Sequence, residues 1–407
     1  MKSRLELLQG TAQLAGEGLL GAVDTVEGMH LAIVETVARF VPFGGLVTRS
    51  TGFVYARIRD AAQLTRRAAD GAIALLERSG VRGDALDIAP AQMAWLSALN
   101  GAIGDRLEAS ANPLAIPMRL CRAGQVIDTQ SARFGAEVEA AGGTLYVLVH
   151  GLGMNDLQWR DADGRDFGDR LAQDVAGHAT RLRYNSGRRI SANGRDLSTL
   201  LQQVYRSHTA AIRRIVLIGH SMGGLVCRSA CADAQRNGLD WSRVLSDVIC
   251  LGSPHLGAPL ERLGDSLSGL LALTPYTRSL AAVAETRSAG VKDLRHGWSS
   301  DRDRGATATV EPEASGAKAG LLPFNERVRW YLVAATLGAH SVGTRARWLG
   351  DGLVPVPSAL GQHDDPARAL RVPRGHRRVF TQTGHMDLLT HAGLYAQIRD
   401  WVAAPLA

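Results

Sequence analysis

Lysine is scarce in this chain of 407 residues, which contains only Lys2, Lys292 and Lys318. The formal net charge is nevertheless +7, because arginine supplies all the other basic residues. A positive chain attracts phosphate, so a nucleic acid or an anionic membrane has to be considered as a partner. The arginine clusters at 181–189 and 371–378 are interpreted as solvated faces, and no DNA- or RNA-binding motif accompanies them. We therefore expect no nucleic-acid partner.

Cysteine is similarly scarce, with four residues in the whole chain. Cys227 and Cys231 lie four residues apart in a predicted helix, and Cys250 lies in an apolar predicted strand, so we interpret them as small buried residues. No combination of cysteine and histidine has the spacing of a zinc site. The cysteine pattern therefore predicts a reduced compartment and no metal.

Long apolar runs are absent as well. No uninterrupted apolar stretch approaches the length of a membrane span, and Glu6 interrupts the N-terminal segment where a secretory signal needs its apolar core. These features predict a cytoplasmic protein, with peripheral membrane contact left open. The length allows one large α/β domain with an ample core and a helical extension.

A serine between a predicted strand and a predicted helix carries the most specific chemical signal. The apolar run Ile215–Ile218 enters the sequence Gly219-His-Ser221-Met222-Gly223. This is the context of a nucleophile elbow, in which glycines two residues either side of the serine avoid the clash of a Cβ atom. Ser221 is therefore the predicted nucleophile, and the Met222 amide, at the start of the helix, is the first predicted oxyanion donor. Because 45 glycines also produce the bare pattern by chance, its weight depends on its surroundings.

An elbow serine needs an orienting acid and a basic histidine, which follow it along the chain in that order. Asp351 lies between two glycines in a loop beyond the predicted strand Arg329–Ala335 and is the predicted acid, although an Asp-Gly turn has the same sequence. His385 follows the last predicted strand in a Gly-His loop and is the predicted base. Two rivals rank lower, because Asp247 lies at the wrong end of its strand and His391 lies inside the last predicted helix.

A glycine-containing loop upstream of the serine supplies the second predicted oxyanion donor. The predicted strand Thr144–Val149 runs into His150-Gly151-Leu152-Gly153, where glycine lets the backbone approach a substrate. The Leu152 amide is the predicted donor. His150 precedes the serine and ends a strand, so a structural role is predicted for it.

The chain is predicted to consist of a helical N-terminal extension at 1–112 and an α/β domain at 113–407. In the extension, apolar residues recur at three- and four-residue spacing between Val23 and Val37 and between Met93 and Leu107. We interpret these helices as packing against each other or the following domain, with a membrane-surface anchor as the alternative. From about Leu114 onward, strands alternate with helices, which predicts a mostly parallel central sheet.

From about Leu145 to Ala404 the sequence resembles the lipase branch of the α/β-hydrolases, especially the bacterial relatives of GPI inositol-deacylases. The likeness lies in His150-Gly-Leu-Gly153, Gly219-His-Ser-Met-Gly-Gly224, Leu251-Gly-Ser-Pro-His255-Leu-Gly-Ala-Pro259 and the loop Gly350-Asp-Gly-Leu-Val-Pro355. The resemblance implies an α/β-hydrolase fold and a serine hydrolase, either a lipase or an esterase, that cleaves esters of hydrophobic acyl groups. It also implies that no cofactor is needed.

A long insertion at about 255–326 interrupts the predicted α/β domain. Leu260–Leu273 is an apolar amphipathic segment, Leu280–Trp298 is a second predicted helix, and Ser300–Gly320 has no hydrophobic periodicity. In lipase-like enzymes such an insertion forms a helical cap over the acyl pocket, and a loose surface excursion is the alternative.

The sequence as a whole predicts a two-step ester hydrolysis through an acyl-enzyme on Ser221, with a hydrophobic ester or a lipid as substrate. Two alternatives stay open. The same acyl-enzyme serves transfer to an alcohol or thiol instead of water. A non-catalytic protein that binds a lipid or another partner can also be built on the same scaffold.

Overall fold

The computed structural model describes residues 9, 10, 13, 90–160, 165–258, 288–299, 322–324, 327–341, 343 and 349–405. The chain divides into two compact units, one of Met1–Ile88 with Leu107–Ala115 and one of Ala89–Arg106 with Ile116–Ala407. The helices predicted between Val23 and Val37 lie outside the described residues. The second unit carries the α/β domain. The division after residue 112 stays a prediction.

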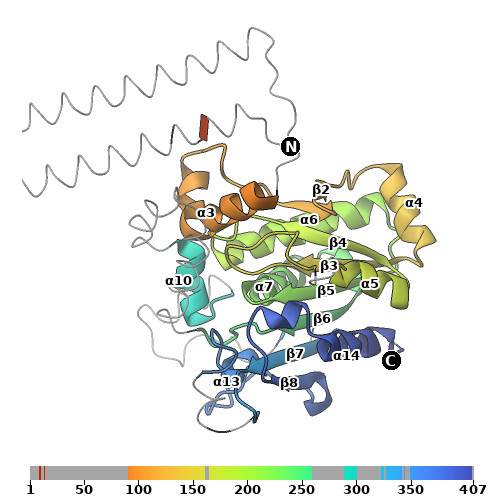
Figure 1. The fold of residues 1–407 in the computed structure, drawn as a ribbon. Coiled ribbons are helices and arrows are strands. Elements are labelled where there is room, and N and C mark those ends of the chain that lie inside the picture. Colours follow the sequence, from red (N-terminus) through yellow and green to blue (C-terminus); the bar gives the residue numbers. More distant parts are fainter. Residues whose placement is uncertain are drawn as a thin grey trace, which may run out of the picture. The chain divides into compact units, whose positions relative to one another are not determined.

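Eight strands of the described residues form one sheet at the centre of the second unit (Figure 1). They are β1 (Arg119–Arg122), β2 (Gln125–Val126), β3 (Thr144–Val149), β4 (His178–Arg183), β5 (Arg214–His220), β6 (Leu245–Leu251), β7 (Arg329–Thr336) and β8 (Arg377–Thr381). Their order in the sheet is β2-β1-β4-β3-β5-β6-β7-β8, and β3 to β8 pair in parallel. The antiparallel pairs among the described strands are those that β1 makes with β2 and with β4. The predicted α/β sheet is confirmed.

Helices cover both faces of this sheet. The described helices are α3 (Pro90–Ala109), α4 (Ala132–Ala140), α5 (Phe167–Asp174), α6 (Ile190–Ser207), α7 (Met222–Asn237), α10 (Ala289–His296), α13 (Val356–Ala359) and α14 (Ala392–Ala403). Successive residues of a strand point to opposite faces, so β3 contributes Leu145 and Val147 to the core with α6 and α7, and Tyr146 and Leu148 to the core with α5 and α14. Burial on both faces explains the continuous apolar runs of β3 and β5. Helices on both faces of a parallel sheet, with a serine turn after its central strand, form the α/β-hydrolase fold.

The predicted insertion is described only in part. Of the helix predicted at Leu280–Trp298, the described part contains α10, which begins after Ser288, whose hydroxyl accepts from the Val291 amide, and ends at Gly297 in the left-handed region. Leu260–Leu273 and Ser300–Gly320 lie outside the described residues. The helical cap therefore stays a prediction. None of the helices described here has the length and apolar character to cross a membrane.

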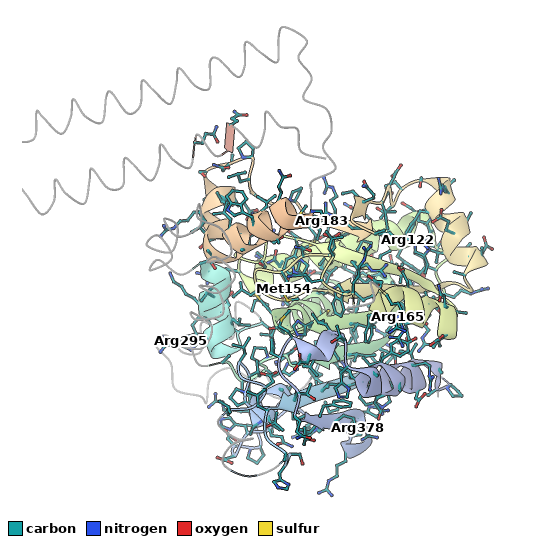
Figure 2. All side chains as sticks on the ribbon, viewed as in Figure 1. Arg122, Met154, Arg165, Arg183, Arg295 and Arg378 are labelled. Atoms are coloured by element: carbon teal, nitrogen blue, oxygen red, sulfur yellow. The ribbon has the colours of Figure 1, made fainter. Side chains whose placement is uncertain are left out.

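The two arginine clusters differ from each other. Arg371, Arg374 and Arg378 are exposed, as expected for a solvated face, and Figure 2 shows Arg378 at the margin of the domain near β8. The interpretation of 181–189 as a solvated face is wrong. Arg181 is buried, and each arginine of this segment pairs with a carboxylate: Arg181 with Asp166 and Asp169, Arg183 with Asp156, Arg188 with Asp196 and Arg189 with Asp293. Pairing offsets the cost of taking these charges out of water, so the cluster belongs to the fold.

Candidate active site

Ser221 lies at the sharp turn between β5 and α7, in a backbone conformation that residues other than glycine rarely adopt. Its φ is 55° and its ψ is −125°, and the residue is buried. The glycines two residues either side of Ser221 are required because other backbone atoms lie too close for a Cβ atom. A Cβ atom on Gly219 would lie 2.4 Å from the Gly224 nitrogen, and one on Gly223 would lie 2.1 Å from the Val149 oxygen. The turn therefore has the geometry of a nucleophile elbow.

The strained backbone of Ser221 has a consequence for stability. We expect Ser221→Gly to be more stable than Ser221→Ala by about 1 kcal/mol, because glycine adopts a positive φ without a Cβ clash. Urea unfolding of both variants measures the difference. Ser229, also buried but inside α7, is the matched control, and there we expect alanine to be more stable than glycine. Equal stability of the two Ser221 variants would contradict the strain.

His385 and Asp351 form a buried pair. The Nδ1 atom of His385 lies 2.7 Å from Oδ2 of Asp351, and the His385 amide donates to the Asp351 backbone oxygen at 3.0 Å. The other carboxylate oxygen, Oδ1, accepts from the amides of Leu353 at 3.0 Å and Val354 at 2.8 Å. These bonds hold the carboxylate in place and require the Nδ1–H form of His385, which leaves Nε2 free to accept a proton.

Contacts across the strand ends bring Ser221 and this pair to one place. The Ser221 amide donates to the Leu251 oxygen at 2.8 Å. A Cβ atom on the next residue, Gly252, would lie 3.2 Å from both Asp351 Oδ2 and His385 Cε1. Sequence reasoning missed Gly252, although it stands in the Leu251-Gly-Ser-Pro stretch that carries part of the resemblance. Its φ of 58° and this close approach both require glycine.

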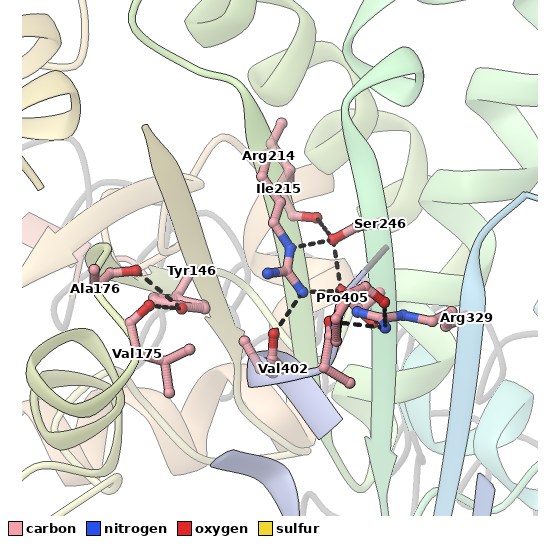
Figure 3. Close-up of polar contacts among 11 residues, drawn as sticks. Tyr146, Val175, Ala176, Arg214, Ile215, Ser246, Arg329, Val402 and Pro405 are labelled. Atoms are coloured by element: carbon pink, nitrogen blue, oxygen red, sulfur yellow. Dashed lines mark hydrogen bonds and ion pairs between the residues drawn. The ribbon is translucent and has the colours of Figure 1, made fainter. Parts of the chain in front are cut away.

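The rival acid Asp247 has a different environment, at the beginning of β6 and away from Gly252. Its carboxylate pairs with Arg214 and Arg329, at 2.7 Å in each case, and accepts from Ser246. Figure 3 shows this network, in which Arg214 also reaches the Val402 oxygen and ties the sheet to the C-terminal helix. Asp247 is therefore occupied by structural ion pairs.

The sequence pattern predicts that the rival base His391 lies inside the last helix, and this prediction is wrong. His391 is the N-cap of α14, and its Nδ1 atom accepts from the Leu394 amide at 3.1 Å. A side-chain acceptor at this position satisfies one of the amides that the first turn leaves unpaired. The ring also lies 4.8 Å from that of Phe380. His391 therefore serves the helix.

The loop after β3 presents a backbone amide beside the serine. A Cβ atom on Gly151 would lie 3.0 Å from Ser221 Cβ, so the loop passes directly over the nucleophile. The Gly153 amide donates to Ser186 Oγ at 2.9 Å, whereas the Leu152 amide has no acceptor among the described residues. Met222 is the first residue of α7, so the helix leaves its amide unpaired too. Neither predicted oxyanion donor thus has a hydrogen-bond acceptor for its N–H group among the described residues.

His150 orients this loop. Its Nδ1 atom lies 2.9 Å from the Gly151 oxygen, which also accepts from the Met154 amide at 3.3 Å. The C=O and N–H groups of one trans peptide point in opposite directions, so holding the Gly151 carbonyl fixes the direction of the Leu152 N–H. Burial lowers the pKa of His150 to about 4, so the ring stays a neutral donor. Met154, at the end of the loop, lies in the interior of the domain (Figure 2).

In the described part of the chain, no group of three or more His, Cys, Asp and Glu side chains is placed to hold a metal ion. The cysteines are buried thiols, as predicted, and burial raises the pKa of Cys121 to about 12. A serine at a helix start, a histidine–carboxylate pair and two free amides form the set of groups that acyl transfer through serine uses.

Comparison with known proteins agrees with this fold. Residues 141–294 match the family model of the PGAP1-like alpha/beta domain, which confirms the resemblance to the lipase and esterase branch of the α/β-hydrolases. No curated protein has a significant sequence match.

Several solved structures of lipases and esterases are similar to the chain. The mature lipase BlEst2 of Bacillus licheniformis is 18% identical, with a TM-score of 0.41 over 64% of this chain and 91% of its own. Lipase B of Aspergillus fumigatus is 12% identical, with a TM-score of 0.40 over 66% of this chain and 55% of its own. The esterase of Pyrobaculum calidifontis is 13% identical, with a TM-score of 0.38 over 64% of this chain and 76% of its own.

Proposed function

We propose that this α/β-hydrolase domain is a carboxylic ester hydrolase that works through an acyl-enzyme on Ser221. One observation carries the proposal: a buried histidine–carboxylate pair, with 2.7 Å between His385 Nδ1 and Asp351 Oδ2, lies beside a serine at a strained strand-to-helix turn. The Leu152 and Met222 amides are the proposed oxyanion donors. This chemistry needs no cofactor.

In the first half of the proposed reaction, Ser221 Oγ attacks the ester carbonyl while His385 Nε2 takes the hydroxyl proton. Asp351 keeps the proton on Nδ1 and stabilises the imidazolium that forms. The negative charge on the carbonyl oxygen is stabilised by the Leu152 and Met222 amides, which are oriented before the substrate binds. His385 then gives its proton to the leaving alcohol, and the acyl group remains on Ser221.

In the second half, water replaces the alcohol. Water attacks the acyl-enzyme while His385 takes a proton from it, and the same two amides stabilise the second oxyanion. The C–O bond to Ser221 breaks, His385 returns the proton to Ser221 Oγ, and the carboxylic acid leaves. Water enters at the position that the alcohol vacated, so a competing alcohol or thiol can take its place. Product analysis with an added alcohol separates hydrolysis from acyl transfer.

The surroundings of the acid and base loops favour a hydrophobic substrate. The large hydrophobic side chains that are exposed in the described residues are Val126, Leu337, Leu349 and Met386. Three of these lie in or beside the loops that carry Asp351 and His385. Met386 follows His385, the Leu337 amide donates to the Gly350 oxygen beside Asp351, and Leu349 precedes that glycine. Exposed apolar side chains gathered at one place indicate a surface that meets an apolar partner.

A series of p-nitrophenyl esters of increasing acyl length tests the proposed function. We expect turnover of these esters, with kcat/KM rising by up to about fourfold per added methylene until the pocket is filled, because each fully buried CH₂ contributes about 0.8 kcal/mol. The assay is run with and without lipid vesicles to include recruitment to a surface. Absence of turnover at every chain length, in folded protein, would contradict an ester hydrolase.

A further inference from the structure

His220 lies one residue before the proposed nucleophile, and its side chain contacts the proposed base. It ends β5 and is fully buried. Its ring lies against that of His385, with 4.7 Å between the centroids and 45° between the planes. Its Nε2 atom lies 3.1 Å from the backbone oxygen of His385. A carbonyl oxygen only accepts, so the proton of His220 is on Nε2 and Nδ1 carries none.

The backbone of His385 is therefore held on both sides. Its N–H group donates to the Asp351 oxygen at 3.0 Å, and its C=O group accepts from His220. The neighbours of His385 contribute less packing, because Gly384 has no side chain and Met386 is 48% exposed. These two hydrogen bonds fix the peptide groups that set the position of the imidazole ring.

His220 is suited to holding the base and unsuited to replacing it. Burial lowers the pKa of His220 to about 3, and positive charge on His385 opposes its protonation further. The ring therefore stays neutral while His385 gains and loses a proton in the proposed mechanism. Nδ1 of His220 has no partner among the described residues, so no chain of hydrogen bonds leads a proton through this ring.

We infer that His220 is a positioning residue that links the nucleophile to the base, by donating from Nε2 to the His385 carbonyl and keeping His385 Nε2 within reach of Ser221. The inference rests on the proposed function. Because His220 is covalently joined to Ser221, any shift of the elbow carries the donor with it. The two catalytic groups, which are far apart in the sequence, thus keep their mutual position.

A pair of amide variants tests this role. The side-chain nitrogen of glutamine can reach the place of Nε2, whereas that of asparagine is shorter and corresponds to Nδ1. We expect His220→Gln to keep kcat for a p-nitrophenyl ester within about fivefold of the parent, and His220→Asn to lose about 100-fold in kcat, as a misplacement of about 1 Å does. KM is expected to change by less than about threefold in both variants, because the donor acts on the base and not on the substrate.

His178→Asn is the matched control. This histidine is also buried but begins β4, at the opposite end of the strands, so kinetics like those of the parent are expected. Circular dichroism of each variant establishes that it is folded. Equal kcat for the Gln and Asn variants of His220, or a loss confined to KM, would overturn the positioning role. If the parent itself hydrolyses no ester, the proposed function fails, and the kinetic loss in His220→Asn has no meaning.

A measurement on the parent protein tests the hydrogen bond from His220 to the His385 carbonyl even where a variant does not fold. Nitrogen-15 NMR of labelled histidines distinguishes the two neutral tautomers. We expect His220 to show a protonated Nε2 and an unprotonated Nδ1 throughout the pH range in which the protein is folded and active. The opposite tautomer would remove the donor to the His385 carbonyl and overturn the inference, whether or not the parent hydrolyses esters.

Discussion

Replacing Ser221 with alanine is expected to lower kcat for ester hydrolysis by about 10⁶-fold, which is the size of effect that follows removal of a serine nucleophile. The loss has one cause in the proposed mechanism, since no acyl-enzyme can form without Oγ. The two oxyanion amides and the substrate pocket remain, so a residual rate of about 10³-fold over water is expected. Initial rates with a p-nitrophenyl ester at high enzyme concentration measure both quantities.

The alanine variant is also expected to stay folded, because it keeps a Cβ atom and the backbone bond from residue 221 to the Leu251 oxygen. Ser229→Ala, a change of a buried serine inside α7, is the control for a general effect of losing a hydroxyl, and its kcat is expected to equal that of the parent. Ester hydrolysis by Ser221→Ala at the parent's rate would remove Ser221 from the mechanism.

Asp351→Asn is expected to lower kcat by about 10⁴-fold while leaving the loop intact. The asparagine oxygen can still accept from the amides of Leu353 and Val354, which fixes where its nitrogen must lie. The NH₂ group then faces His385 Nδ1 and donates to it. His385 is forced into the tautomer with its proton on Nε2, and it can no longer take the proton of Ser221. KM is expected to change little.

Asp247→Asn is the matched control for this carboxylate. Asp247 is just as buried, but it pairs with Arg214 and Arg329 at the other end of β6. Removing its charge is expected to destabilise the protein, by up to about 3 kcal/mol in urea unfolding, because two partly buried arginines lose their partner. The folded fraction is expected to keep the parent's kcat. A larger loss of kcat in Asp247→Asn than in Asp351→Asn would exchange the assignments of the two acids.

Local sequence patterns predicted the α/β fold and named Ser221, Asp351 and His385 as the candidate triad. The strands β3 and β5 are continuous apolar runs because they are buried on both faces, and such runs are visible in the sequence. The elbow is also local, since its glycines stand two residues either side of Ser221. Asp351 and His385 could be named from their order along the chain and from the strands that precede them.

Features that depend on tertiary contacts could not be predicted in this way. The donation from His220 to the His385 carbonyl joins residues 165 positions apart, and no periodicity indicates it. The same holds for the arginines at 181–189, whose carboxylate partners come from other segments. The sequence pattern predicts His391 inside the last helix, whereas the helix begins after it, because helix boundaries are the least certain part of a sequence-based prediction. The N-cap position then gave its side chain a different partner.

Labelling with a fluorophosphonate, followed by peptide mass spectrometry, tests directly whether Ser221 is the nucleophile. We expect one phosphonyl group per chain, attached to Ser221, with labelling abolished in Ser221→Ala and slowed in Asp351→Asn because His385 no longer activates the hydroxyl. Folded protein that takes up no label, or that takes it up on a residue other than Ser221, would contradict the proposed acyl-enzyme.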